Sequence, residues 1–110
     1  MIDWHRVDEL RDEIGADDFS EVFELFLDEV HSVIEKLRHR PKRDDLESDL
    51  HFLKASALNL GFSALAEKCL AGERQAANDR HDQVNLTAIL DCFDQSLAEF
   101  PEGLPKRFAA

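Results

Sequence analysis

The sequence predicts an all-α fold, an antiparallel up-and-down four-helix bundle with an additional short N-terminal helix. Apolar residues recur at intervals of three and four along most of the 110 residues, which is the repeat of a helix with one buried face. No stretch alternates apolar and polar residues for long enough to predict a strand. The links between the helical stretches are short and polar, so consecutive helices are expected to pack antiparallel.

The first predicted helix covers about residues 3–14 and ends at Gly15, because glycine is favoured just after a helix. Trp4 is expected to pack with it. Its apolar residues at helical spacing are Ile2, Val7, Leu10 and Ile14. This short helix is expected to cap the bundle.

The second predicted helix is longer, from Asp17 and Asp18 to about Arg40, just before Pro41. The two carboxylates suit its N-terminus because the helix dipole favours negative charge there. Its apolar stripe lasts about five turns and consists of Phe19, Val22, Phe23, Phe26, Val30, Val33, Ile34 and Leu37.

Two further helices are expected on either side of Gly61. The third follows a polar link at 41–44 and runs into Gly61, and the fourth covers about 63–78. Gly72 lies inside the fourth helix, where glycine costs up to about 1 kcal/mol relative to alanine. The fourth helix is therefore expected to bend or fray at Gly72.

A fifth helix is expected after the polar link at 78–81, and Pro101 is expected to end it. Its apolar positions are Leu86, Ile89, Leu90, Phe93, Leu97 and Phe100. The chain is thus predicted to be one domain over residues 1–110, with the bundle at about 17–100 and an irregular tail at 101–110.

Composition narrows the possible functions. The formal net charge of −11 and the pI near 4.7 argue against nucleic acid and anionic membranes as partners. The four glycines form no phosphate-binding loop, so no nucleotide site is expected. No cofactor bound by this chain itself is expected either. Cys69 and Cys92 lie in apolar helical patterns and are predicted to be buried and reduced. With no leader and no apolar run of about 18 residues, the protein is expected to be cytoplasmic.

One histidine lies at the edge of the apolar stripe of the third helix. Five residues of this stripe fall within roughly 80° of one another, namely Leu46, Leu50, Leu53, Ala57 and Leu60. His51 lies about 120° from the middle of the stripe, so one side of its ring is supported and the other is expected to meet water. Lys54 and Glu47, three residues on and four residues back, are expected on the same surface.

The motif His51-x-Leu53-Lys54-x-Ser56, followed by Gly61, resembles the signature of histidine phosphotransfer (HPt) domains of multistep phosphorelays. The resemblance implies that His51 accepts a phosphoryl group from a phospho-aspartyl receiver domain and passes it to another receiver. It also implies that Lys54 places positive charge near the phosphoryl oxygens. On this reading the chain is a carrier and no kinase, and the Mg²⁺ ion of the reaction belongs to the partner receiver.

The same resemblance suggests further site residues. A polar residue of the following helix orients the histidine in the family, and Glu73 falls at that position, with Gln75 as the alternative. Ala55 stands where family members commonly have glycine, and it leaves room for the partner. The expected docking surface consists of Glu47, Ser48, Phe52, Ala55, Leu58 and Phe62. The expected partners are response-regulator receiver domains and a hybrid sensor histidine kinase, each bound by a monomer.

Two other functions are alternatives to phosphotransfer, a metal-binding bundle and an unphosphorylated adaptor. A metal-binding bundle would use Glu-x-x-His pairs, and the nearest match is the single pair Asp28 and His31, which falls largely off the apolar stripe. A helical adaptor would bind a receiver or a kinase without being phosphorylated. The remaining histidines lack the motif and are expected to be solvated surface residues: His5, His31, His39 and His81.

Overall fold

The chain is a bundle of helices with no strand in the part that the structure describes. The computed structural model describes residues 2–15 and 17–108, including the side chains of residues 2–15, 17–19 and 21–99. The α-helices are α1 (Trp4–Ile14), α2 (Phe19–His39), α3 (Leu46–Leu60), α4 (Ser63–Ala77) and α5 (Leu86–Phe108). Two short 3₁₀ turns, η1 (Arg43–Asp45) and η2 (His81–Gln83), precede α3 and α5. The predicted all-α class is confirmed.

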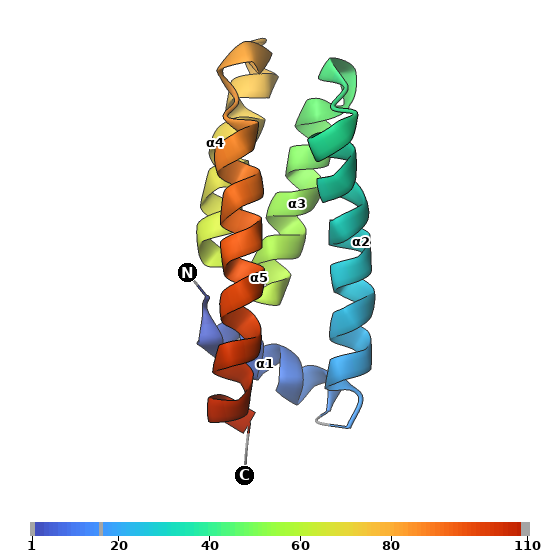
Figure 1. Ribbon diagram of the computed structural model, residues 1–110, viewed down its shortest axis with the longest axis vertical. Coiled ribbons are helices and arrows are strands. Elements are labelled where there is room, and N and C mark those ends of the chain that lie inside the picture. Colours follow the sequence, from blue (N-terminus) through green and yellow to red (C-terminus); the bar gives the residue numbers. More distant parts are fainter. Residues whose placement is uncertain (1, 16, 109–110) are drawn as a thin grey trace.

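Helices α2 to α5 lie side by side as long rods, with consecutive helices running in opposite directions, and give the molecule extents of 48 × 21 × 21 Å (Figure 1). Helix α3 packs between α2 and α4, and α5 packs against α4 and α2. Helix α1 crosses one end of the bundle and contacts α2 and α3. Each of the four long helices can therefore turn an apolar face toward a shared core.

Local signals in the sequence account for the helix ends. Asp3 caps α1, because its side chain accepts a hydrogen bond from the Arg6 backbone N–H at 3.2 Å. The Asn85 side chain does the same for α5 by accepting from the Ala88 backbone N–H at 3.0 Å. Helix α2 ends at His39, and Arg40 separates it from Pro41, since the residue before a proline disfavours the helical conformation.

The turn between α3 and α4 requires glycine. Gly61 has φ of +82°, and a Cβ atom built on it would lie 2.7 Å from the Asp3 carbonyl oxygen. The Asp3 backbone N–H in turn donates to the Gly61 carbonyl oxygen at 2.6 Å. Gly61 thus allows α4 to fold back on α3 and lets the start of α1 rest on the turn.

The core fills the space between the helices and follows the predicted stripes. Its largest fully buried side chains include Ile34, Leu37, Leu50, Leu53, Phe62, Leu65 and Phe93. Cys69 and Cys92 are buried with free thiols, as predicted, and burial raises the pKa of the Cys69 thiol to about 12.

The expectation that α4 frays beyond Gly72 is wrong, because α4 runs unbroken from Ser63 to Ala77. Gly72 is buried, and a Cβ atom there would lie 3.0 Å from Leu50 Cδ1 and 3.3 Å from Val84 Cγ1. The missing side chain lets α4 approach its neighbours closely, and this packing holds the glycine in the helix.

The predicted irregular tail is also wrong, because α5 continues through Pro101 to Phe108. Proline removes one backbone hydrogen bond, but its fixed φ of about −65° is itself a helical value. A helix can therefore pass through Pro101. The last two tail residues, 109 and 110, lie outside the described residues. Among the helices described here, none is both long enough and apolar enough to cross a bilayer.

Candidate functional site

His51 projects from the second turn of α3, and its side chain is 64% exposed. Its neighbours in the apolar stripe, Leu50 and Leu53, are fully buried. The backbone that carries His51 is therefore anchored in the core while the imidazole reaches water, as the helical spacing predicted.

Glu73, on α4, meets the imidazole of His51. The distance from His51 Nδ1 to Glu73 Oε1 is 2.7 Å. The helices approach closely here because Gly72, the residue before Glu73, packs against Leu50, the residue before His51. Close packing of α3 and α4 thus brings a carboxylate onto one edge of the ring.

The same carboxylate also holds Lys54. Lys54 Nζ lies 2.8 Å from Glu73 Oε2, so the two carboxylate oxygens serve two different cationic or donor groups. The Lys54 ammonium, followed by the contact with His51, lowers the pKa of the Glu73 carboxyl, although burial opposes this shift. Glu73 is therefore a carboxylate at neutral pH.

An ionised carboxylate is an acceptor only, so the hydrogen in the short contact with Glu73 is on His51 Nδ1. In a neutral imidazole this leaves the lone pair on Nε2. Within the described part of the chain, the ring of His51 has no other hydrogen-bond partner. The site thus presents an available nitrogen nucleophile at the surface of the bundle.

A surface hollow of about 330 Å³ lies beside the histidine. It is lined by Asp44, Glu47, Ser48, His51 and Glu73. The hollow extends from the reactive ring to the link that precedes α3, and it gives a partner side chain access to His51 from that direction.

The six expected docking residues differ in how far their side chains are exposed. Glu47 and Ser48 are exposed and line the hollow, and Ala55 and Leu58 are exposed further along α3, Leu58 at 56%. Phe52 is partly buried. The expectation for Phe62 is wrong, because this side chain is fully buried in the core at the start of α4 and offers no surface.

Of the two candidates for orienting the histidine, the structure brings Glu73 to the ring. Gln75 instead lines a hollow of about 200 Å³ with residues of α4, of α5 and of the link between them, such as Lys68, Ile89 and Asn85. Two residues along a helix correspond to a rotation of about 200°, which explains why Glu73 and Gln75 cannot face the same neighbour.

Sequence reasoning missed two features of the site, the Lys54–Glu73 ion pair and the place of Asp44 in the hollow. The spacing of His51 and Lys54 contained a signal for the first, because residues three apart share a helix face and one carboxylate can reach both. Asp44 lies in η1, outside the periodic part of the helix, so periodicity gave no signal for it.

The metal-site reading gains no support from the geometry. Asp28 and His31 are both exposed on α2, and the His31 ring meets Phe93 of α5 edge-on, with 5.2 Å between ring centroids. Among the side chains that the structure describes, no three from His, Cys, Asp or Glu cluster as a metal site requires.

Comparison with known protein families identifies the family of the chain. A family model described as the Hpt domain matches residues 5–99, which is most of the chain. No curated protein and no solved structure gives a significant match. The matched range contains all of the residues that form the site on α3 and α4.

Proposed function

Because the chain belongs to the Hpt domain family, whose members carry phosphoryl groups in phosphorelays, we propose that His51 is its phosphoacceptor. In this proposal His51 takes the group from a phospho-aspartyl receiver domain and passes it to another receiver. The observation that supports it best is the exposed ring whose Nδ1 lies 2.7 Å from the Glu73 carboxylate.

The first step is an attack by His51 Nε2 on the phosphorus atom of the partner's acyl phosphate. An N–P bond forms, the P–O bond to the aspartate breaks, and the carboxylate leaves with the electron pair. The lone pair on Nε2 of the neutral imidazole needs no base to act as a nucleophile. Transfer to the second receiver is the same exchange in the opposite direction.

Glu73 contributes before and during this step. By accepting the Nδ1 hydrogen it holds the ring in one tautomer and one orientation, which reduces the cost of reaching the reactive geometry. As the N–P bond forms, positive charge develops on the ring, and the carboxylate stabilises it at a distance of 2.7 Å.

Lys54 is proposed to stabilise the phosphoryl oxygens by its charge, as expected from the motif. In the unphosphorylated chain Lys54 is bound to Glu73, and its side chain is only 22% exposed. Because this contact lowers the pKa of Glu73, Lys54 also keeps Glu73 ionised. The Mg²⁺ ion of the transfer is proposed to belong to the partner receiver. The partners are proposed to be receiver domains and a hybrid sensor histidine kinase, and the place of action the cytoplasm.

The experiment is phosphate uptake from phosphoramidate, followed by intact-mass spectrometry. We expect wild type to gain one phosphate that is acid-labile and alkali-stable, and His51→Gln to gain none while its circular dichroism spectrum is unchanged. His39→Gln is the matched control, because His39 is 66% exposed and also lies 3.0 Å from a carboxylate, Glu35, yet lacks the motif.

Equal uptake by His51→Gln and wild type would show that the phosphoacceptor is another residue. No uptake by wild type from phosphoramidate and from several phosphorylated receivers, together with retained receiver binding, would favour the unphosphorylated adaptor.

A further inference from the structure

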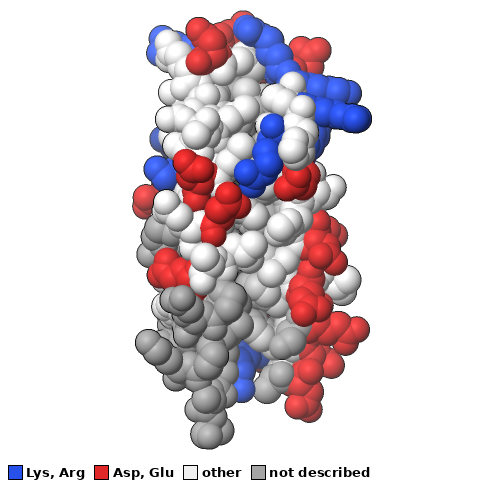
Figure 2. All heavy atoms as spheres, viewed as in Figure 1, with Lys and Arg blue, Asp and Glu red and all other residues white. Residues whose placement is uncertain are grey.

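Basic residues gather at one end of this acidic protein. Residues 36–43 contain five Lys and Arg side chains and no acidic one, whereas residues 1–35 contain twelve Asp and Glu against two Arg. Figure 2 shows a group of Lys and Arg at the upper end of the bundle, where α2 ends, with some Asp and Glu beside it and a row of Asp and Glu along the flank below. Along α2 the charge thus changes from acidic to basic toward the upper end of the bundle.

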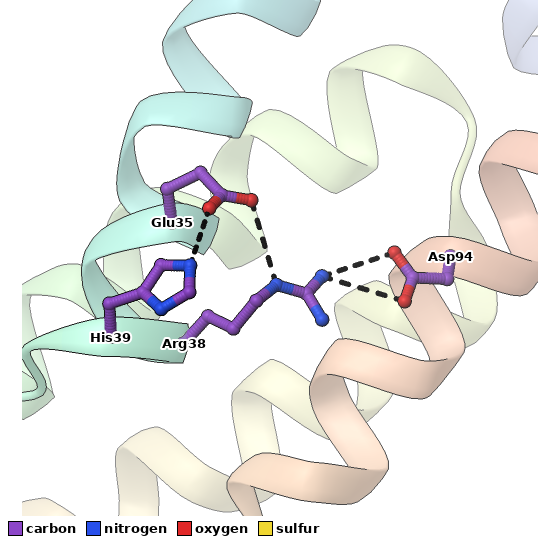
Figure 3. A network of polar contacts seen from close by, with 4 residues as sticks. All are labelled: Glu35, Arg38, His39 and Asp94. Atoms are coloured by element: carbon purple, nitrogen blue, oxygen red, sulfur yellow. Dashed lines mark hydrogen bonds and ion pairs between the residues drawn. The ribbon is translucent and has the colours of Figure 1, made fainter.

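Two of these five cations are neutralised by the fold. Lys36 Nζ lies 3.0 Å from both Asp45 Oδ2 and Asp49 Oδ2 and joins α2 to the start of α3. Arg38 reaches Asp94 on α5 at 3.2 Å and Glu35 at 3.5 Å, and Glu35 also meets His39 at 3.0 Å (Figure 3). Lys36 and Arg38 thus tie α2 to its neighbours, and their charges are balanced by carboxylates of the bundle.

The other three cations have no such role. Arg40, Lys42 and Arg43 are exposed, and no described carboxylate lies within ion-pair distance of them. They stand within four residues of one another in the link between α2 and α3. We call these three residues the cationic link.

The cationic link adjoins the phosphotransfer site. Asp44, the residue after Arg43, lines the hollow beside His51. Helix geometry places Arg43 roughly 13 Å from His51 along the axis. A transient interface covers about 600 to 800 Å² per partner, a disc with a radius of roughly 15 Å. A partner centred on His51 therefore reaches Arg43 near its edge, and the cationic link begins at the rim of that interface.

We propose that the cationic link is an electrostatic docking element for the phosphoryl donor and acceptor, and that these partners present an acidic surface beside their phospho-aspartate. This inference rests on the proposed function of His51 and names the chemistry of the surface that meets it. Opposite charges at the edge of an interface act mainly on the association rate, because they steer the encounter before contact. The distance from His51 exceeds the Debye length of about 8 Å at physiological salt, so the link acts on the partner and not on the phosphoryl group.

The test compares wild type with Arg40→Gln/Lys42→Gln/Arg43→Gln. The control is Lys68→Gln/Arg74→Gln/Arg80→Gln, which removes three exposed cations of α4 and the α4–α5 connection and lowers the net charge equally. The probe is a receiver domain phosphorylated with acetyl phosphate, selected from a panel because it phosphorylates the wild-type chain. Transfer is followed at about 20 mM and about 300 mM salt.

We expect kcat/KM of the cationic-link variant to fall at least about threefold at low salt and to converge with wild type at high salt. Its kcat at saturation stays unchanged, and the control variant follows wild type. Across the panel, kcat/KM should rise with the number of Asp and Glu residues that surround the receiver's phosphorylated aspartate.

Equal loss in both variants, or no loss in either, would overturn the proposal. The same holds if the cationic-link variant loses binding to a DNA duplex or to phosphatidylserine vesicles while its transfer is unaffected. Uptake from phosphoramidate separates this inference from the proposed function. If wild type takes up no phosphate, the assignment of His51 fails, whereas normal uptake in all chains without a salt-dependent loss rejects only the cationic link.

Discussion

Glu73 connects Lys54 to His51. One of its oxygens lies 2.7 Å from the ring and the other 2.8 Å from Lys54. A change at Lys54 therefore reaches the histidine through the carboxylate. Three side chains from two helices form one unit, and their effects on transfer are not expected to add.

Replacing Glu73 with glutamine keeps an acceptor for the Nδ1 hydrogen but removes the negative charge. We expect kcat for transfer to fall about 10- to 100-fold, the range typical when the partner that orients a metal-bound histidine is lost. KM should change little, because Glu73 is only 17% exposed and offers a partner little surface. Stopped-flow transfer from a phosphorylated receiver checks this, and a change confined to KM would contradict the positioning role.

Replacing Lys54 with alanine is expected to slow transfer more than it weakens docking. It removes positive charge near the phosphoryl group and also the main cause of the lowered pKa of Glu73, which should return toward its ordinary value. We expect kcat to fall roughly tenfold or more with little change in Kd, measured by calorimetry and single-turnover kinetics. Weakened binding with an unchanged transfer rate would count against charge stabilisation.

The elements that place the site are α3 and α4, and glycine controls their geometry. Gly61 makes the tight turn that folds α4 back on α3, and Gly72 lets the two helices approach at the level of His51. The end of α2 is tied to α3 by a different device, the pair of contacts from Lys36 to Asp45 and Asp49. This junction sets the position of the link that carries the proposed docking charges.

The Lys36 junction should give a recognisable dependence of stability on pH. Hydrogen bonds to the two aspartates raise the pKa of Lys36, and Lys36 lowers that of Asp45. The Asp45 contribution is therefore present above its unfolded pKa of about 3.8 and is lost as pH falls through the lower folded value. The Lys36 contribution is present below about 10.5 and is lost as pH rises through the higher folded value.

Lys36→Met keeps most of the aliphatic stem and removes the charge, so it isolates this contribution. We expect the difference in free energy of unfolding between wild type and Lys36→Met to be constant from about pH 5 to pH 9 and to shrink beyond both limits. Urea denaturation at each pH measures it. A difference that does not vary between pH 2 and pH 11 would show that the ion pairs contribute nothing.

The whole molecule is a slender acidic rod whose long helices turn their apolar faces inward (Figures 1 and 2). Among the described residues the exposed large hydrophobic side chains are Leu25 and Leu58, which lie on different helices. Two single side chains do not make the contiguous apolar patch that a stable dimer needs. The net charge of −11 adds repulsion between copies.

We therefore expect the unphosphorylated chain to be a monomer in solution. Size-exclusion chromatography with light scattering should give a mass close to 12.6 kDa over a range of protein concentrations. A mass near twice this value at micromolar concentration, unaffected by Leu58→Ser, would show that another surface joins two copies.

The sequence by itself determined the all-α class, the order of the helices and the candidate histidine. Apolar residues at helical spacing identify the face that each helix buries, and a motif on one helix, such as that of His51 and Lys54, can be read from that helix alone. The helix ends at Gly15 and Gly61 were predictable for the same reason, because capping depends on residues close in sequence.

Only the tertiary structure decided what depends on neighbouring elements. It brought Glu73 rather than Gln75 to the ring, placed Phe62 in the core and paired Lys54 with Glu73. It also kept α4 unbroken through Gly72, which local propensity disfavours, because packing against Leu50 outweighs the intrinsic cost of glycine. Which side chains of α3 and α4 meet depends on how closely and at what rotation the two helices pack, and no single helix contains that information.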